Sequence, residues 1–240
     1  MREFTSAVAS AAKTSLVNVS VAVVLQVRDG VLQVLLWQRA RQPFAGAWAL
    51  PGGVLTPDET LEASIRRHLA TKVDLREVAH LEQLATYGDP GRNPVDWEIA
   101  TAYLGLVPLG VDPSVPTDTS WHAVDGLPTT AFDHGAIIQS ARDRLRGKLS
   151  YSNICFALAP ATFTLNELRD VYAAALGYDV SSTNLKRVLL RRGALLPTGG
   201  RRDPGRAGGR PAEEFAFSEQ ALEITDPFAA LRPPDPHTVS

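Results

Sequence analysis

Apolar residues in the N-terminal half follow both strand-like and helix-like patterns. Val17 to Val27 is a β-branched apolar run, and Asp29-Gly30 separates it from a second run, Val31 to Trp37. A DG pair between two such runs predicts a β-hairpin with a type I′ turn, because glycine accepts the positive φ of that turn. From Glu59 to Lys72 the apolar residues recur every four positions, which predicts an amphipathic helix. The pattern therefore indicates a mixed α/β domain.

Three further strands and a second helix extend this domain. Apolar runs predict a short strand at Trp48 to Leu50 before a Gly loop, and longer strands at Leu81 to Tyr87 and at Ile99 to Val107. The proline-rich segment 108–116 predicts a surface loop. Asp133 to Gly147 predicts a helix that links this domain to the remainder of the chain.

After Leu149 the pattern becomes helical. We predict a short apolar helix at Tyr151 to Ala159, and a second helix that opens on a capping box of Thr164 and Glu167. Gly177 is the predicted end of that helix, and Ser181 or Ser182 is the predicted N-cap of the next one, which ends at Gly193. Two short strands follow, Leu195 to Pro197 and Glu214 to Phe217, on either side of a Gly/Arg loop at 198–210. Helices followed by a two-stranded basic wing outline a winged helix-turn-helix, an α+β domain.

Charge is concentrated in this second domain. The whole chain of 240 residues has a net charge of −2, but residues 181–210 hold eight basic residues and one acidic residue, a net of +7. A field of this kind attracts phosphate backbones, so we expect the domain to bind DNA. The polar side of the predicted recognition helix, 182–192, carries Thr183, Asn184, Lys186, Arg187 and Arg191.

Composition sets the remaining limits. The single cysteine, Cys155, lies in an apolar run and excludes an intramolecular disulfide framework. No apolar stretch is long enough for a membrane span, and no signal peptide is evident, so we expect a cytoplasmic protein. The expected organisation is an arm at 1–16, an α/β domain at 17–147 with its linker helix at 133–147, the winged helix at 148–217, and a Pro-rich tail at 218–240.

Three residues of the first domain have a diagnostic spacing. Gly53, Glu59 and Arg67 stand at G-x5-E-x7-R, the opening of a Nudix box, with a hairpin before them and a helix where the motif requires one. The domain therefore resembles the Nudix fold, an α/β/α sandwich. Three glutamates normally complete the box and together bind divalent metals. Here those positions hold His68, Thr71 and Lys72, and Asp74 replaces the final glycine.

These replacements argue against catalysis. Threonine is a poor Mg²⁺ ligand, histidine prefers softer metals, and lysine repels a cation. We therefore expect no metal site, no required cofactor and no pyrophosphohydrolase activity by the usual mechanism. Such a domain still offers a nucleotide pocket, for which the candidate contacts are Arg39, Arg41, Trp48, Gly53, Tyr87 and Arg92.

The combination of a degenerate Nudix domain and a winged helix resembles the Nudix-related transcriptional regulators, the NrtR family. The resemblance spans about residues 17–217 and is carried by the segments Leu81-Glu-Gln-Leu84, Tyr87-Gly-Asp-Pro90, Ala131-Phe-Asp-His134, Phe163-Thr-Leu-Asn-Glu-Leu168, Val171-Tyr172, Asn184-Leu-Lys-Arg187 and Gly209-Arg-Pro-Ala-Glu213. One departure is Val95, where relatives often have a second arginine after Arg92.

The resemblance implies a homodimeric repressor of NAD-metabolism genes that binds a pseudo-palindromic operator and senses ADP-ribose or a related nucleotide. It implies recognition-helix contacts by Asn184, Lys186 and Arg187, and wing contacts by Arg202 and Arg210. Two alternatives remain open. One is a Nudix hydrolase with altered metal chemistry and an accessory winged helix, and the other is a constitutive DNA binder whose first domain is a dimerisation scaffold.

Overall fold

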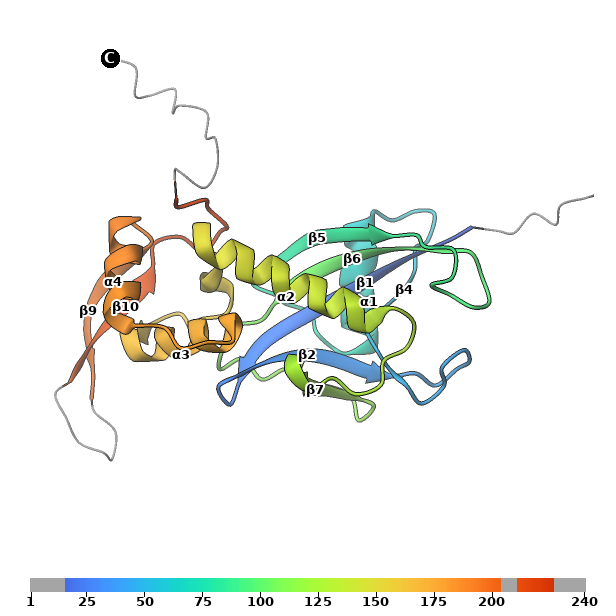
Figure 1. Cartoon of the computed structure of the whole chain (residues 1–240), viewed down its shortest axis with the longest axis horizontal. Coiled ribbons are helices and arrows are strands. Elements are labelled where there is room, and N and C mark those ends of the chain that lie inside the picture. Colours follow the sequence, from blue (N-terminus) through green and yellow to red (C-terminus); the bar gives the residue numbers. More distant parts are fainter. Residues whose placement is uncertain (1–15, 204–210, 227–240) are drawn as a thin grey trace, which may run out of the picture.

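The N-terminal domain is built on a seven-stranded mixed sheet in the computed structural model, which describes residues 16–203 and 211–226 (Figure 1). The sheet order is β3-β2-β1-β6-β5, while β4 pairs with β1 and β7 pairs with β2. Its strands are β1 (Val17–Arg28), β2 (Val31–Gln38), β3 (Trp48–Ala49), β4 (Gly52–Val54), β5 (His80–Tyr87), β6 (Glu98–Leu106) and β7 (Thr119–Ala123). The sequence pattern did not predict β7.

The β1–β2 hairpin has the predicted turn. Asp29 and Gly30 have φ angles of 51° and 74°, so both central residues are left-handed, as a type I′ turn requires. Arg28 pairs with Val31 across the turn. This local signal therefore fixes the register between β1 and β2.

Helices cover both faces of the sheet. Val21, Val23 and Leu25 of β1 pack into one core with helix α2 (His134–Tyr151), whereas Ala22 and Val24 pack with helix α1 (Leu61–Lys72). The alternation of side chains along a strand places these two sets on opposite faces. The α/β/α sandwich is thereby confirmed, and the predicted amphipathic helix is α1, capped by the Thr60 side chain.

Gly52 of β4 pairs with Val21 of β1, and the close contact between the two strands gives a stability prediction. A Cβ at position 52 would lie 2.7 Å from the Cα of Val21 and closer still to the Ser20 carbonyl oxygen. We expect Gly52→Ala to lower the free energy of unfolding by about 1–3 kcal/mol, because backbone atoms have to move. Denaturant unfolding measures this, with Gly91→Ala as control, since a Cβ there meets nothing within 4 Å. Equal midpoints for both variants would contradict the prediction.

The C-terminal domain combines two helices with a three-stranded sheet of order β8-β10-β9, within the residues described. Its elements are β8 (Phe163–Thr164), α3 (Leu165–Leu176), α4 (Ser182–Arg191), β9 (Leu195–Arg202) and β10 (Ala212–Phe217). The capping box is confirmed, with Thr164 and Glu167 bonded reciprocally, and Gly177 ends α3 with a φ of 79°. Ser181 is the N-cap of α4. These features complete the winged helix.

Two predicted elements differ from the structure. The apolar helix at Tyr151 to Ala159 is wrong: α2 continues to Tyr151, Ser152 is extended, and only a 3-10 turn, η2 (Ile154–Ala157), follows. The reason is non-local, since Ser152 forms a β-bridge with Ile224 near the end of the described chain. A second 3-10 turn, η1 (Val124–Gly126), precedes α2, and the wing strand β9 extends through residues predicted as loop.

The two domains share one core. Leu145 and Leu149 of α2 pack in the same apolar cluster as Phe163 and Leu168 of the winged helix, and Figure 1 shows α2 reaching from the large sheet to α3 and α4. Part of the predicted tail belongs to this junction. The Asn153 side chain donates to the carbonyl of Ala221 at 2.8 Å and accepts from the N–H of Glu223 at 2.7 Å.

Two predictions from the sequence concern residues wholly or largely outside the described ones, namely the N-terminal arm and Arg210. The tail beyond residue 226 also lies outside them. Within the described part of the chain, no helix is both long and apolar enough to span a membrane.

Candidate functional sites

A cavity of about 540 Å³ opens at one end of the large sheet. Its walls come from β1, β4, the loop between β2 and β3, the end of α1, the loop before β6 and the start of α2. The lining includes Arg39, Arg41, Gly52, Gly53, Lys72, Asp96, Glu98, Phe132 and His134. Distant segments of sequence thus meet at one cavity with both charged and apolar walls, in the domain that resembles a nucleotide hydrolase.

Basic side chains enter this cavity from two elements. Lys72, the last residue of α1, donates from Nζ to the Gly52 carbonyl at 2.5 Å, and its Nζ lies 4.4 Å from the centre of the Trp37 ring. Arg39 donates from Nε to the Pro43 carbonyl at 2.9 Å, and its guanidinium stacks over Phe132 at 4.7 Å. Burial lowers the pKa of Arg39, and the nearby Glu98 carboxylate opposes that shift. The cavity therefore presents fixed positive charge.

The glutamate that remains in the Nudix box is fully engaged. Arg67 donates to both carboxylate oxygens of Glu59, from Nε at 2.8 Å and from Nη2 at 2.5 Å, and the Thr56 N–H donates to Oε1 at 2.8 Å. These hydrogen bonds, led by that of Arg67, hold the pKa of Glu59 well below its usual range. Glu59 and Arg67 therefore fasten the loop before α1 to the helix.

The other box positions do not form a metal ligand set. His68 is buried against Gly53, its Nε2 lies 3.2 Å from the Val54 carbonyl oxygen, and burial lowers its pKa. The Thr71 hydroxyl donates to the Arg67 carbonyl of its own helix. No group of three or more His, Cys, Asp or Glu side chains suited to a metal occurs in the described residues. Asp74, which stands at the position of the final box glycine, has a left-handed backbone with a φ of 49°.

The predicted effector contacts separate into two groups. Arg39 and Gly53 line the cavity, together with Arg41. Trp48, Tyr87 and Arg92 do not line it: Trp48 packs on His122, and Tyr87 packs against the core. The Arg92 guanidinium donates to both oxygens of Asp133 and also pairs with Glu98. Arg92 therefore has carboxylate partners of its own.

The cavity lining also includes residues that the sequence did not predict as effector contacts, among them Lys72, Phe132 and His134. Phe132 and His134 belong to Ala131-Phe-Asp-His134. Phe132 has a φ of 53° and packs on Phe44, while Nδ1 of buried His134 accepts from the Leu50 N–H at 3.0 Å. Burial lowers the pKa of His134 to about 3, so the ring is neutral. His134 is also the first residue of α2, which connects the cavity to the second domain.

The recognition helix α4 presents a continuous polar face. Thr183, Asn184, Arg187 and Arg191 are all exposed and recur at helical spacing on the side opposite buried Leu185 and Leu189. The Arg187 guanidinium donates to the Asn184 side-chain oxygen at 2.8 Å, so the two groups stand together. Arginine and asparagine are suited to bidentate contacts with guanine and adenine in a major groove.

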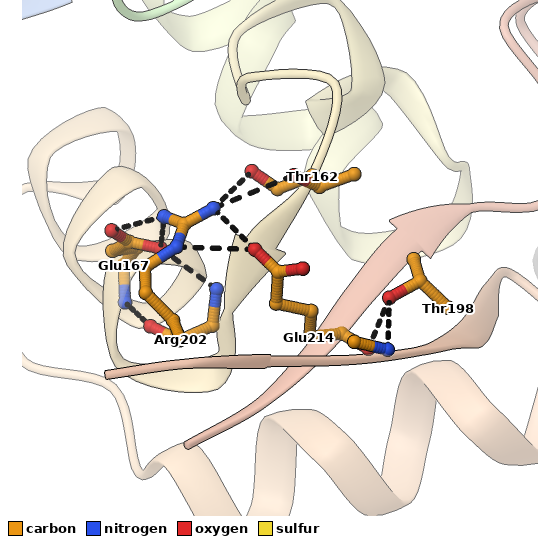
Figure 2. A network of polar contacts seen from close by, with 7 residues as sticks. Thr162, Glu167, Thr198, Arg202 and Glu214 are labelled. Carbon is orange, nitrogen blue, oxygen red and sulfur yellow. Dashed lines mark hydrogen bonds and ion pairs between the residues drawn. The ribbon is translucent and has the colours of Figure 1, made fainter. Parts of the chain in front are cut away.

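Two predicted DNA contacts, Lys186 and Arg202, have carboxylate partners among the described residues. Figure 2 shows Arg202 of the wing between Glu167 of α3 and Glu214 of β10, with both ion pairs at 2.7 Å. Lys186 pairs with Glu213 at 3.2 Å and lies over the Phe215 ring. Arg202 thus clamps the wing onto the capping box of α3, whereas Arg201, its neighbour, is exposed.

Two family models match this chain, one in each domain. The NUDIX domain model matches residues 17–140, and the NrtR DNA-binding winged helix domain model matches residues 155–217. The ADPR responsive transcriptional repressor NtrR of Acinetobacter baylyi is 31% identical over 212 residues, which cover 85% of this chain and 83% of the relative. An ADP-ribose pyrophosphatase of Methanocaldococcus jannaschii is 31% identical over 130 residues, which cover 50% of this chain and 72% of that enzyme.

Solved structures of two-domain relatives are also similar. Shewanella oneidensis NrtR complexed with a 27mer DNA has a TM-score of 0.71 and 33% identity over 83% of this chain and 93% of its own. A second crystal structure of Shewanella oneidensis NrtR has a TM-score of 0.73 and 32% identity over 84% of this chain and 94% of its own. Fold and sites thus define a Nudix domain joined to a DNA-binding winged helix. The chain belongs to the NrtR family of Nudix-related transcriptional regulators.

Proposed function

We propose that this protein is a transcriptional repressor of NAD-metabolism genes that binds operator DNA through α4 and the wing. The observation that carries the proposal is the exposed face of Asn184, Arg187 and Arg191, which has no carboxylate partner among the described residues. The family relation supports the same role. Since such operators are pseudo-palindromic, the binding unit is a homodimer that places one α4 in each half-site.

We propose further that the cavity of the N-terminal domain binds ADP-ribose or a related nucleotide and thereby changes DNA affinity. The positive charge of Arg39, Arg41 and Lys72 suits a diphosphate. Helix α2 supports the coupling, because its first residue lines the cavity and its last turns pack in the core shared with the winged helix. No cofactor is required in this scheme.

The competing proposal is a nucleotide pyrophosphohydrolase, and the Methanocaldococcus relative, named an ADP-ribose pyrophosphatase, favours it. The geometry disfavours it, since Glu59 is held by Arg67 and the three later box positions supply no carboxylate. We propose that the domain is not an enzyme. Incubation with ADP-ribose and Mg²⁺, followed by chromatography for AMP, tests this, and we expect no AMP above the protein-free control.

Fluorescence anisotropy on NAD-biosynthesis promoter fragments tests the repressor. We expect salt-sensitive binding that prefers one fragment to scrambled DNA, because phosphate contacts release counterions while base contacts select the site. We expect added ADP-ribose to weaken that binding. Binding no better than to scrambled DNA contradicts the NAD assignment, whereas specific binding that ignores ADP-ribose favours a constitutive DNA binder.

A further inference from the structure

We propose that Lys72 serves as a built-in cation in place of the metal ions of a Nudix enzyme, so that the cavity holds the diphosphate of its nucleotide without divalent metal. This inference rests on the proposed sensing function and deepens it. Its basis is the position of one residue: Lys72 occupies the last of the three glutamate positions of the box, and its ammonium reaches the cavity.

The ammonium group is held in place before any ligand binds. Nζ donates to the Gly52 carbonyl at 2.5 Å and lies 4.4 Å from the centre of the Trp37 ring. Trp37 is itself fixed by the hydrogen bond from its Nε1 to the Leu50 carbonyl at 3.1 Å. An ammonium has three donors, so two remain for oxygens of a ligand. A donor that is already ordered loses little entropy on binding.

The surroundings of Lys72 favour an anion as occupant. Arg39 and Arg41 line the same cavity, and burial, followed by the charges of Arg39 and Arg67, lowers the pKa of Lys72. The lining has two carboxylates, Asp96 and Glu98. Glu98 is paired with Arg92 and hydrogen-bonded by Asn93, so Asp96 is the other negative charge to set against the cations of the lining. The lining therefore has excess positive charge in a partly desolvated space, and a diphosphate relieves that repulsion.

The donor set also explains why a metal is not needed. A diphosphate in a Nudix enzyme has its charge neutralised by divalent ions held on glutamates. Here those glutamates are absent, and Glu59 is occupied by Arg67. Lysine binds phosphate as a point charge and arginine as a bidentate donor, so Lys72 with Arg39 and Arg41 supplies comparable neutralisation.

Calorimetric titration of the full chain with ADP-ribose, and separately with inorganic pyrophosphate, tests the inference. We expect equal affinity in EDTA and in excess Mg²⁺ for ADP-ribose. We expect Lys72→Met to weaken both ligands about 10- to 100-fold, the loss of a charge-assisted contact, and Lys72→Arg to retain most of the affinity. Lys72→Met keeps an apolar stem against Trp37, and its thermal midpoint is measured to show that it folds.

Arg66→Met is the matched control, because Arg66 is an exposed cation of the same helix, pairs with Glu62 and does not line the cavity. Binding that requires Mg²⁺, or that is unchanged in folded Lys72→Met, overturns the role of Lys72 and leaves the sensor intact. If the wild type binds neither ADP-ribose nor pyrophosphate, the inference and the sensing function both fail, and anisotropy then judges the repressor separately.

Discussion

We expect the replacement of Arg92 with alanine to lower the free energy of unfolding of the N-terminal domain by about 3–5 kcal/mol. The Arg92 side chain is only 2% exposed and bridges Glu98, at the start of β6, to Asp133, the N-cap of α2. Both carboxylates are themselves largely buried, at 14% and 25% exposure. Removing the guanidinium leaves two uncompensated charges, which costs far more than the loss of an exposed ion pair.

Thermal unfolding measures this effect. For a chain of this size we expect the midpoint to fall by roughly 6–20 °C. Arg76→Ala is the control, because Arg76 is 76% exposed and its pair with Asp74 spans 3.4 Å, so its loss changes stability by less than about 1 kcal/mol. An Arg92→Ala protein as stable as Arg76→Ala would show that the Glu98 and Asp133 pairs contribute little.

This structural role changes what an Arg92 variant says about ligand binding. Loss of response to ADP-ribose in Arg92→Ala follows from a displaced α2 N-terminus as readily as from a lost phosphate contact. Arg39 and Arg41 line the cavity without bridging buried carboxylates, so substitutions there report on the ligand more directly. The contact assigned to Arg92 by sequence therefore remains a prediction, and its test needs the stability of each variant measured alongside.

Local signals explain which parts of the fold were predictable. The Asp29-Gly30 turn, the four-residue apolar repeat of α1 and the capping box of α3 all act within a few residues, and the structure has each of them. The failures depend on distant partners. The structure has no α-helix at Tyr151 to Ala159, because Ser152 forms a β-bridge with Ile224 directly after the end of α2. The two bridge partners lie too far apart in the sequence for a local pattern to include both.

The same distinction applies to the sites. The sequence alone identifies the substitutions at box positions 68, 71 and 72, and it gives the net charge of the segment that contains the recognition helix and the wing. The sequence does not show which basic side chains form ion pairs within the protein. Arg92 pairs with Asp133 across 41 positions, and Arg202 pairs with Glu167 across 35 positions. The net charge of +7 therefore overstates the field that DNA would meet, since several of its cations have carboxylate partners.

We expect the replacement of Arg187 with alanine to weaken binding to the operator about 10- to 100-fold. Arg187 lies near the middle of the exposed face of α4, and a bidentate arginine–guanine contact contributes about 1–3 kcal/mol of discrimination against the wrong base. Its hydrogen bond with Asn184 orients both side chains at 2.8 Å, so Asn184→Ala has an effect of the same sign. Neither residue packs in the core, so the domain still folds.

The form of the loss identifies the kind of contact. If Arg187 reads a base, its loss relaxes specificity, and the ratio of operator to scrambled affinity falls. If it binds phosphate, affinity falls about equally for both DNAs and the slope of log K against log salt decreases by about one. We expect the first pattern for Arg187 and the second for Arg201, the exposed wing arginine. Arg66→Ala, which removes one positive charge from α1, is the control for the change in net charge. If Arg187→Ala bound the operator as tightly as the wild type, this face of α4 would not contact the operator.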